Sequence, residues 1–257
     1  MSPPRPDAFP AVTAEQMLEV DRRAVERYEL ALVQMMENAG RALARVARER
    51  FLVGANDPGR VVVLAGPGGN GGGAMVAARR LAGWGVRVRV LATATVEAMA
   101  PVTARQARTL AAFGVDVDTV GEADGGSWPD SAGVDLVLDG LLGYSGRGEP
   151  RGAVRDAIRW VSAAGVPILA LDVPSGVDAT SGAVAGVAIH ASATVTLAAP
   201  KTGLRSPSAA PHVGALYLAD LGIPAAAYEG LIDPAVVATW FVADDVVLVA
   251  DEVVPVR

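Results

Sequence analysis

Short apolar runs alternate with amphipathic stretches along most of the chain. Runs of the kind found in strands buried on both faces occupy residues 61–65, 134–138 and 167–171. Between them, apolar side chains recur at helical spacing, as at Ala104, Ala107 and Leu110. Strands that alternate with helices predict an α/β fold in which helices cover both faces of a parallel sheet.

The same reading gives the remaining elements. Thr13 and Gln16 form a capping-box pattern, so a helix is predicted from this point to about residue 28. Residues 54–59 are predicted to form a turn, and residues 121–130 a polar loop. Further helices are expected at residues 31–51, 75–82, 101–113 and 153–164, and further strands at 86–91, 115–117, 193–197, 215–219 and 244–249.

The stretch most suggestive of chemistry lies between the first strand and the helix that begins at residue 75. Residues 66–73 contain six glycines. Glycines let backbone N–H groups approach an anion closely, and a helix N-terminus favours negative charge. The stretch is therefore predicted to be a phosphate-binding loop at the floor of an active site, although an ordinary glycine-rich turn has the same appearance.

Two familiar phosphate motifs fit this stretch poorly. Gly66, Gly68 and Gly71 satisfy the G-x-G-x-x-G spacing, but that fingerprint also requires an acid at the end of the second strand. The strand at 86–91 is followed by no acid before Glu97, which disfavours a dehydrogenase. No lysine follows the glycines, so a P-loop is excluded.

Two predicted strands end in a carboxylate, Asp139 and Asp172. Ligands of open parallel sheets bind beyond the carboxyl ends of the strands, so both acids are expected beside the glycine stretch. Asn70, Asp139 and Ser175 could offer oxygen ligands to a small hard cation, and so few ligands favour a monovalent ion over Mg²⁺. The alternative is that each acid only caps the following helix.

Composition narrows the classes of function. The 257 residues carry a formal net charge of −6, which argues against a nucleic-acid partner. The absence of cysteine excludes disulfides and a thiol nucleophile, and the two histidines are better explained as structural or surface residues. No apolar run approaches membrane-spanning length and the N-terminus lacks a signal-peptide core, so a cytoplasmic protein without a membrane partner is expected.

Five motifs, taken together and in this order, resemble the YjeF N-terminal domain family over about residues 12–224. They are Met-Glu-Asn-Ala-Gly at 36–40, the glycine stretch at 66–72, Asp-Gly-Leu-Leu-Gly at 139–143, Asp-Val-Pro-Ser-Gly-Val-Asp at 172–178 and Ala-Pro-Lys at 199–201. The resemblance implies a Rossmann-like three-layer α/β/α sandwich with a mostly parallel central sheet. The family domain is placed at residues 12–230, after a flexible lead at 1–11 and before a C-terminal extension at 231–257 that packs on the same domain.

The resemblance also implies an isomerase of nicotinamide nucleotide repair. The family's best-known activity is NAD(P)H-hydrate epimerase, which interconverts the R and S epimers of hydrated NADH and NADPH at C6 of the damaged ring. A separate dehydratase then restores the S form, and members often form homodimers. Both features are therefore expected for this chain.

Residue roles follow from the matched motifs. Asn70, Asp139 and Ser175 would bind K⁺, and Asp172 would contact the substrate beside the reacting ring and carry the proton chemistry. The positions expected to line the substrate are Gly69, Asn70, Gly71, Gly72, Gly73, Gly143, Tyr144, Ser145, Gly146, Arg147 and Asp172.

The glycine stretch departs from the family's usual Gly-Pro-Gly-Asn-Asn-Gly-Gly-Asp-Gly. Gly69 replaces the first Asn, Gly73 replaces the Asp, and Ala74 replaces the last Gly. The lost carboxylate leaves two alternatives open: a ligand-binding or scaffold member without catalysis, and an enzyme that acts on a different phosphate-bearing substrate. The retained Asp139, Asp172 and Ser175 favour the epimerase.

Overall fold

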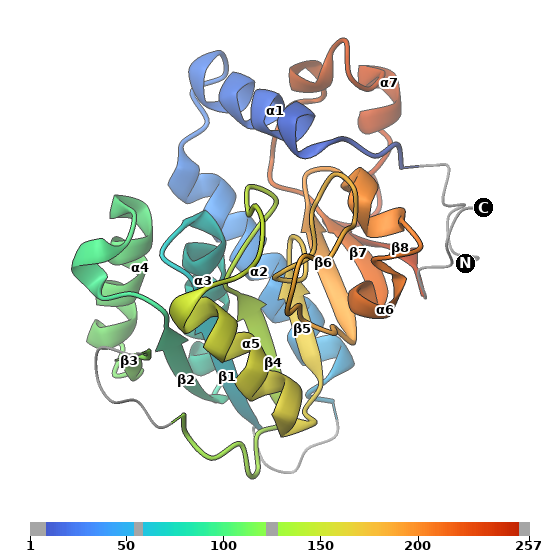
Figure 1. Cartoon of the computed structure of the whole chain (residues 1–257). Coiled ribbons are helices and arrows are strands. Elements are labelled where there is room, and N and C mark those ends of the chain that lie inside the picture. The colour runs from blue at the N-terminus through green and yellow to red at the C-terminus, as the bar shows by residue number, and fades with distance from the viewer. Residues whose placement is uncertain (1–8, 54–58, 122–127, 252–257) are drawn as a thin grey trace.

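A single mixed sheet forms the centre of the protein, in a computed structural model that describes residues 9–53, 59–121 and 128–251 (Figure 1). In these ranges the strand order is β3-β2-β1-β4-β5-β6-β7-β8, with every neighbouring pair parallel except β7 and β8. The α/β class and the mostly parallel sheet are thus confirmed. The strands are β1 Arg60–Ala65, β2 Arg87–Ala92, β3 Val117–Thr119, β4 Leu136–Gly140, β5 Ile168–Leu171, β6 Ala193–Leu197, β7 Ala215–Ala219 and β8 Val246–Ala250.

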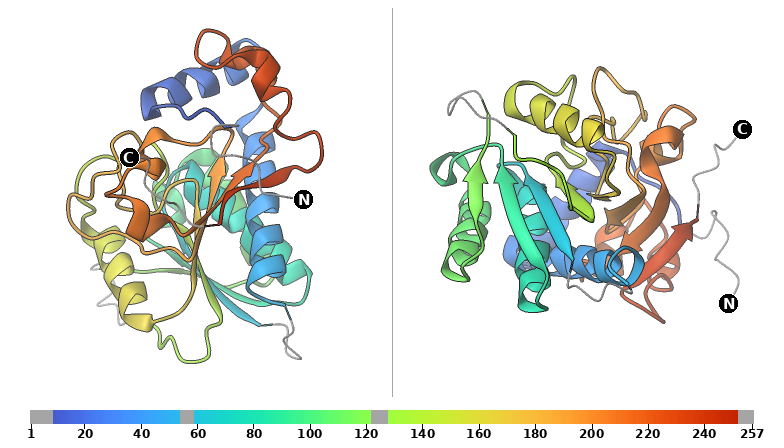
Figure 2. Two further views of the ribbon diagram at one scale, coloured as in Figure 1. Left: turned by 90° about the vertical axis from the view of Figure 1, so that its right-hand side faces the viewer. Right: turned by 90° about the horizontal axis from the view of Figure 1, so that it is seen from below.

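Helices cover the sheet on both faces because alternate strand residues point to opposite sides (Figure 2). Val61 and Val63 of β1 pack with α2 (Leu32–Arg50), α3 (Gly69–Gly83) and α4 (Pro101–Ala112). Val62 and Leu64 face the other way, toward α5 (Gly152–Ala164). The shorter helices are α6 Ala210–Val213, α7 Pro234–Val237 and the 3₁₀ turns η2 Val96–Ala98, η4 Thr202–Arg205 and η5 Ala225–Tyr228.

The first helix, α1 (Ala14–Glu26), lies above the edge of the sheet where the parallel strands end (Figure 1). The predicted capping box is confirmed, because the Thr13 hydroxyl accepts from the Gln16 amide and the Gln16 side chain accepts from the Thr13 amide. The helix packs in one apolar cluster with residues that follow β5 and β6, among them Val173 and Ala198. This placement sets α1 beside the predicted active site.

The prediction for the glycine stretch is wrong in one respect, the position at which the helix begins. We predict a loop over residues 66–73 and a helix from residue 75, whereas α3 begins at Gly69 and only residues 66–68 form the turn. A Cβ on Gly71 would lie 1.9 Å from the Gly66 carbonyl oxygen, and one on Gly72 would lie 2.5 Å from Met36 Cε. Glycine is therefore needed here for close packing of the helix start.

Some predicted features lie partly or wholly outside the described residues. These are residues 1–8 of the N-terminal lead, residues 54–58 of the predicted turn, residues 122–127 of the polar loop and residues 252–257 of the C-terminal extension. Within the ranges that the structure covers, no helix combines the length and apolar character needed to cross a bilayer.

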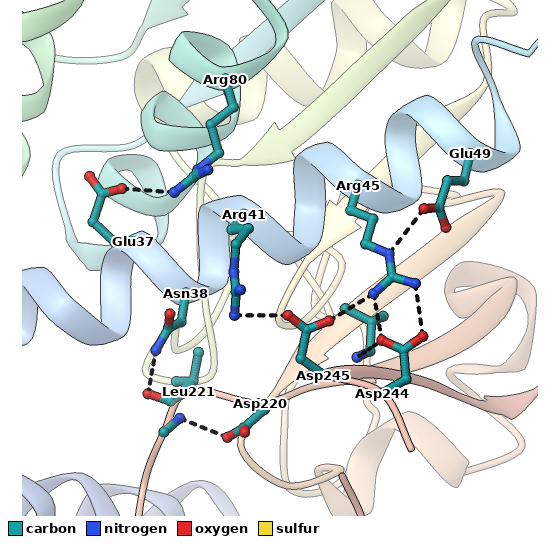
Figure 3. A network of polar contacts seen from close by, with 12 residues as sticks. Glu37, Asn38, Arg41, Arg45, Glu49, Arg80, Asp220, Leu221, Asp244 and Asp245 are labelled. Atoms are coloured by element: carbon teal, nitrogen blue, oxygen red, sulfur yellow. Dashed lines mark hydrogen bonds and ion pairs between the residues drawn. The ribbon is translucent and has the colours of Figure 1, made fainter. Parts of the chain in front are cut away.

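The segment that leads into β8 is fastened to α2 by ion pairs (Figure 3). The Arg45 guanidinium lies 2.5 Å from an Asp244 carboxylate oxygen and 2.7 Å from an Asp245 oxygen. Arg41 reaches the other Asp245 oxygen at 2.8 Å, and Asn38 donates to the Leu221 carbonyl. The segment that leads into β8, near the C-terminus of the chain, is therefore joined to α2, a helix near the N-terminus.

We expect Arg45→Ala to lower the free energy of unfolding by about 1 kcal/mol, because a network of partly exposed ion pairs is lost. Urea denaturation in 50 mM and 1 M NaCl would measure the loss, which should shrink at high salt through screening. Arg105→Ala, which removes an exposed arginine from α4, is the matched control. An equal loss in both variants, or a loss independent of salt, would contradict this account.

Candidate active site

The loops that follow β1, β4 and β5 meet at the carboxyl ends of these three adjacent strands. Asp139 is in β4, Asp172 directly follows β5, and Asn70 lies in the first turn of α3 after β1. Ser175 comes from the loop after β5. The structure thus brings together the four polar residues that the sequence selects for this edge of the sheet.

Asp139 and Ser175 form the deepest part of the site. Ser175 donates to both carboxylate oxygens, from its backbone N–H at 2.8 Å and from its hydroxyl at 2.7 Å. Burial raises the pKa of Asp139 to about 6, against the opposing effect of these hydrogen bonds. No Arg or Lys of the described residues pairs with this carboxylate, so it is a buried acid without a positive partner.

Asn70 joins the loops after β4 and β5. Its side-chain amide donates to the Leu142 carbonyl at 2.8 Å and to the Leu171 carbonyl at 3.1 Å. The Leu142 amide in turn donates to the Ser175 hydroxyl at 2.9 Å. The three predicted cation ligands, Asn70, Asp139 and Ser175, are therefore linked by one chain of hydrogen bonds that passes through the Leu142 backbone.

Asp172 occupies a conformation that few non-glycine residues adopt, with φ at +69°. One carboxylate oxygen accepts from the Tyr144 backbone N–H at 2.8 Å. The other accepts from the Lys201 ammonium. The residue is only 2% exposed, because Gly143 and Tyr144 lie over its side chain.

Lys201 is the site residue that the sequence reasoning did not assign. It is the only lysine of the chain and is fully buried, where its ammonium also donates to the Leu197 carbonyl at 2.7 Å. The available signal was its uniqueness among many arginines and its place at the end of the Ala-Pro-Lys motif. A buried ammonium and a buried carboxylate in contact form a pair able to hold or exchange a proton.

Asp21 is a second residue that the sequence reasoning missed. It lies in α1 and accepts a hydrogen bond from the Tyr144 phenol at 2.6 Å. Burial raises the pKa of Asp21, and burial together with the Asp21 charge raises the pKa of Tyr144. Nothing in an amphipathic helix with neighbouring arginines distinguishes Asp21 from a surface acid, so no local signal could have found it.

The positions predicted to line the substrate are not equally accessible. Gly69 is exposed and Asn70 half-buried, whereas the next three glycines are buried in the first turns of α3. On the other side, Ser145 and Arg147 are exposed, and the Arg147 guanidinium donates back to the Tyr144 carbonyl at 2.9 Å. Only part of the glycine stretch is therefore open to a ligand.

A mostly apolar cavity of about 210 Å³ adjoins the loop after β4. Its walls come from the loops after β4 and β5, which follow Asp139 and begin at Asp172. Small and apolar side chains suit a flat ring with few polar groups. The lining residues include Leu142, Gly143, Gly146, Pro174, Gly176, Val177, Asp178 and Ala183.

Comparison with known proteins places this geometry in a family. Residues 32–203 match the family model described as "YjeF-related protein N-terminus". The chain is 44% identical over 224 residues to the NAD(P)H-hydrate epimerase of Dehalogenimonas lykanthroporepellens, covering 86% of this chain and 85% of that protein. It is 32% identical to the protein of the same name from Rhodopirellula baltica, covering 84% and 86%.

Two further similarities bear on organisation and fold. The bifunctional NAD(P)H-hydrate repair enzyme Nnr of Salinibacter ruber is 36% identical over 84% of this chain, which matches only 41% of that protein. The crystal structure of the yeast protein YNL200c superposes with a TM-score of 0.79 at 24% identity, over 93% of this chain and all of the yeast chain. The yeast structure supports the fold.

Proposed function

Because this chain belongs to the family of YjeF-related N-terminal domains, we propose that it is an NAD(P)H-hydrate epimerase, an isomerase of nicotinamide nucleotide repair. Its substrates would be the hydrates of NADH and NADPH. The observation that carries the proposal is the buried pair of Asp172 and Lys201, placed at the strand ends beside the cavity after β4.

The proposed reaction breaks and re-forms one C–O bond at C6 of the hydrated ring. The hydroxyl takes up a proton and leaves as water, and the ring nitrogen stabilises the resulting cation. Water then adds to the opposite face and loses a proton, so atoms and charge balance over the cycle. A carboxylate suits the stabilisation of such a cation and the proton transfer, and we assign this role to Asp172, with Lys201 holding the exchanging proton.

Asp172 is covered in the conformation described here, since Gly143 and Tyr144 lie over its carboxylate. Substrate contact at this carboxylate therefore requires a shift of Gly143, while the Tyr144 amide and its hydrogen bond to Asp172 stay in place. The three glycines of the loop after β4, Gly143, Gly146 and Gly148, give its backbone the freedom for this shift.

The residues around Asp139 fit a K⁺ ion. The buried carboxylate has no basic partner in the described ranges and accepts from the Ser175 hydroxyl, which in turn accepts from the Leu142 amide. The Asn70 side chain donates to the Leu142 carbonyl and so belongs to the same group. A single carboxylate with neutral oxygens suits a monovalent cation. We propose that Asn70, Asp139 and Ser175 hold K⁺, which when bound supplies positive charge beside Asp139 and orders the loops after β4 and β5.

We expect K⁺ to stabilise the protein. Replacing choline chloride by KCl at constant ionic strength should raise the thermal midpoint, by the equivalent of about 2.7 kcal/mol when K⁺ exceeds its Kd 100-fold. Differential scanning fluorimetry would follow the change. Asp139→Asn should abolish the K⁺-dependent increment and the exposed Asp116→Asn should keep it, so an equal increment in both would exclude Asp139 as a ligand.

The function itself is tested by epimerase turnover. Purified protein is mixed with R-NADHX in K⁺ buffer. An excess of S-specific dehydratase converts the S epimer to NADH, which absorbs at a wavelength different from that of its hydrate. A rate well above spontaneous epimerisation would support the proposal. No acceleration by folded protein would contradict it and favour a non-catalytic ligand-binding member or another phosphate-bearing substrate.

We further propose that the epimerase works with a dehydratase, as the name of the bifunctional Salinibacter ruber relative suggests for that protein. The homodimer and the cytoplasmic location remain predictions. A light-scattering mass equal to that of one chain would rule out a stable dimer.

A further inference from the structure

Tyr144 connects three charged groups that come from different parts of the chain. Its backbone N–H donates to Asp172 at 2.8 Å and its phenol donates to Asp21 at 2.6 Å. The Lys201 ammonium lies 5.6 Å from the centre of its ring, within the range of a cation–π contact. Any movement of Tyr144 therefore alters the surroundings of both members of the buried pair.

The helix that carries Asp21 is itself held in place. The Ala14 amide donates to the Thr180 hydroxyl at 3.0 Å, and the Arg23 guanidinium donates to the Ala227 carbonyl at 3.0 Å. Just before α1, the backbone of Val12 forms a parallel bridge with Lys201. Asp21 thus projects from a helix that is fixed by contacts before it and along it.

Asp21 lies before the stretch that matches the family model, residues 32–203. Its side chain is half-buried. The positive charge of Lys201 attracts its carboxylate, and the negative charge of Asp172 repels it. A half-buried carboxylate is costly unless a partner compensates it, and the Tyr144 phenol is the hydrogen-bond donor that the structure supplies.

We infer that Asp21 is a positioning residue for the epimerase, which holds Tyr144 by its phenol so that the Tyr144 amide keeps the Asp172 carboxylate oriented toward Lys201. This inference rests on the proposed function. Among the described residues, Asp21 makes no hydrogen bond to Asp172, so it orients that carboxylate through Tyr144. Catalytic groups lose activity steeply when their supporting contacts are loosened.

The test compares variants that remove the contact with one that keeps it. Asp21→Ala and Tyr144→Phe should each lower kcat about 10-fold with a smaller change in KM, and the double variant should be no slower than either single one. Asp21→Asn should recover most of the rate, because its amide oxygen still accepts the phenol proton. Glu15→Ala, which removes an exposed carboxylate from the same helix, should leave kcat unchanged.

A second measurement does not depend on activity. Hydrogen exchange of the peptide spanning residues 142–147 should quicken in Asp21→Ala but not in Glu15→Ala, since the Tyr144 amide loses its support. Unchanged exchange, additive losses in the double variant, or a higher kcat in Asp21→Ala would each overturn the inference, the last by showing that the contact only keeps the loop closed. An inactive wild type with the expected exchange pattern would refute the epimerase while leaving the role of Asp21 in positioning Tyr144 intact.

Discussion

Asp172→Asn is expected to lower the rate of R-to-S conversion by about 10²–10⁴-fold, the range that general acid–base groups contribute. The amide keeps the size of the side chain and an oxygen that accepts from the Tyr144 amide. It loses the negative charge that would stabilise the ring cation and the oxygen that would exchange a proton. The coupled dehydratase assay measures the loss, with the spontaneous rate as its lower limit.

The same substitution leaves the buried Lys201 ammonium without its carboxylate partner. A loss of stability must therefore be distinguished from a loss of catalysis. Lys201 is fully buried and donates to Asp172, and removal of one member of such a pair costs about 3–5 kcal/mol. The variant Asp172→Asn/Lys201→Met removes both charges and should regain stability without regaining activity. Asp116→Asn is the control for an exposed carboxylate, and a folded Asp172→Asn protein with near-normal turnover would exclude Asp172 as the catalytic residue.

Gly71→Ala is expected to lower the free energy of unfolding by about 3 kcal/mol or more. The new methyl group would lie 1.9 Å from the Gly66 carbonyl oxygen, a backbone atom that cannot turn away as the end of a side chain can. Either β1 or α3 must move, and both carry the loops of the site. Urea denaturation measures the change, and the shift of the midpoint should come without a change of slope.

Gly69→Ala is the matched variant, two residues earlier in the same helix. A Cβ at Gly69 would meet no heavy atom within 4 Å, so the variant should be neutral or stabilised by up to about 1 kcal/mol through helix propensity. Equal destabilisation of the two alanine variants would show that conformational freedom, and not close packing, is the reason for glycine here.

The contrast between these glycines explains where sequence reasoning failed. Glycine is a poor helix former, so four glycines in residues 69–73 indicate a loop by every local rule. The structure nevertheless starts α3 at Gly69, because these glycines let the helix start approach Gly66 and Met36 closely, and the Met36 contact joins residues far apart in the chain. Close approach of this kind leaves no mark on local periodicity.

The strands could be predicted because their burial leaves a clear local pattern in the sequence. An apolar run such as residues 61–65 is buried on both faces wherever it sits in a parallel sheet, so composition alone identifies it. The carboxylates at the strand ends followed from position in the chain, and Asp139 and Asp172 do lie at the same edge. The presence of Lys201 and Asp21 in the site depends on how distant segments pack against one another, and local sequence patterns carry no such information.

The close approach at the start of α3 also restricts how this sequence can evolve. Members of the resembled family usually carry an Asp where this chain has Gly73, yet a Cβ at that position would lie 3.0 Å from a Leu171 methyl and 3.7 Å from the Ala39 methyl. A returning carboxylate would enter apolar surroundings, where it loses hydration without gaining a partner. We therefore expect epistasis between positions 73 and 171: Gly73→Asp becomes acceptable only after Leu171 has been replaced by a smaller or polar residue.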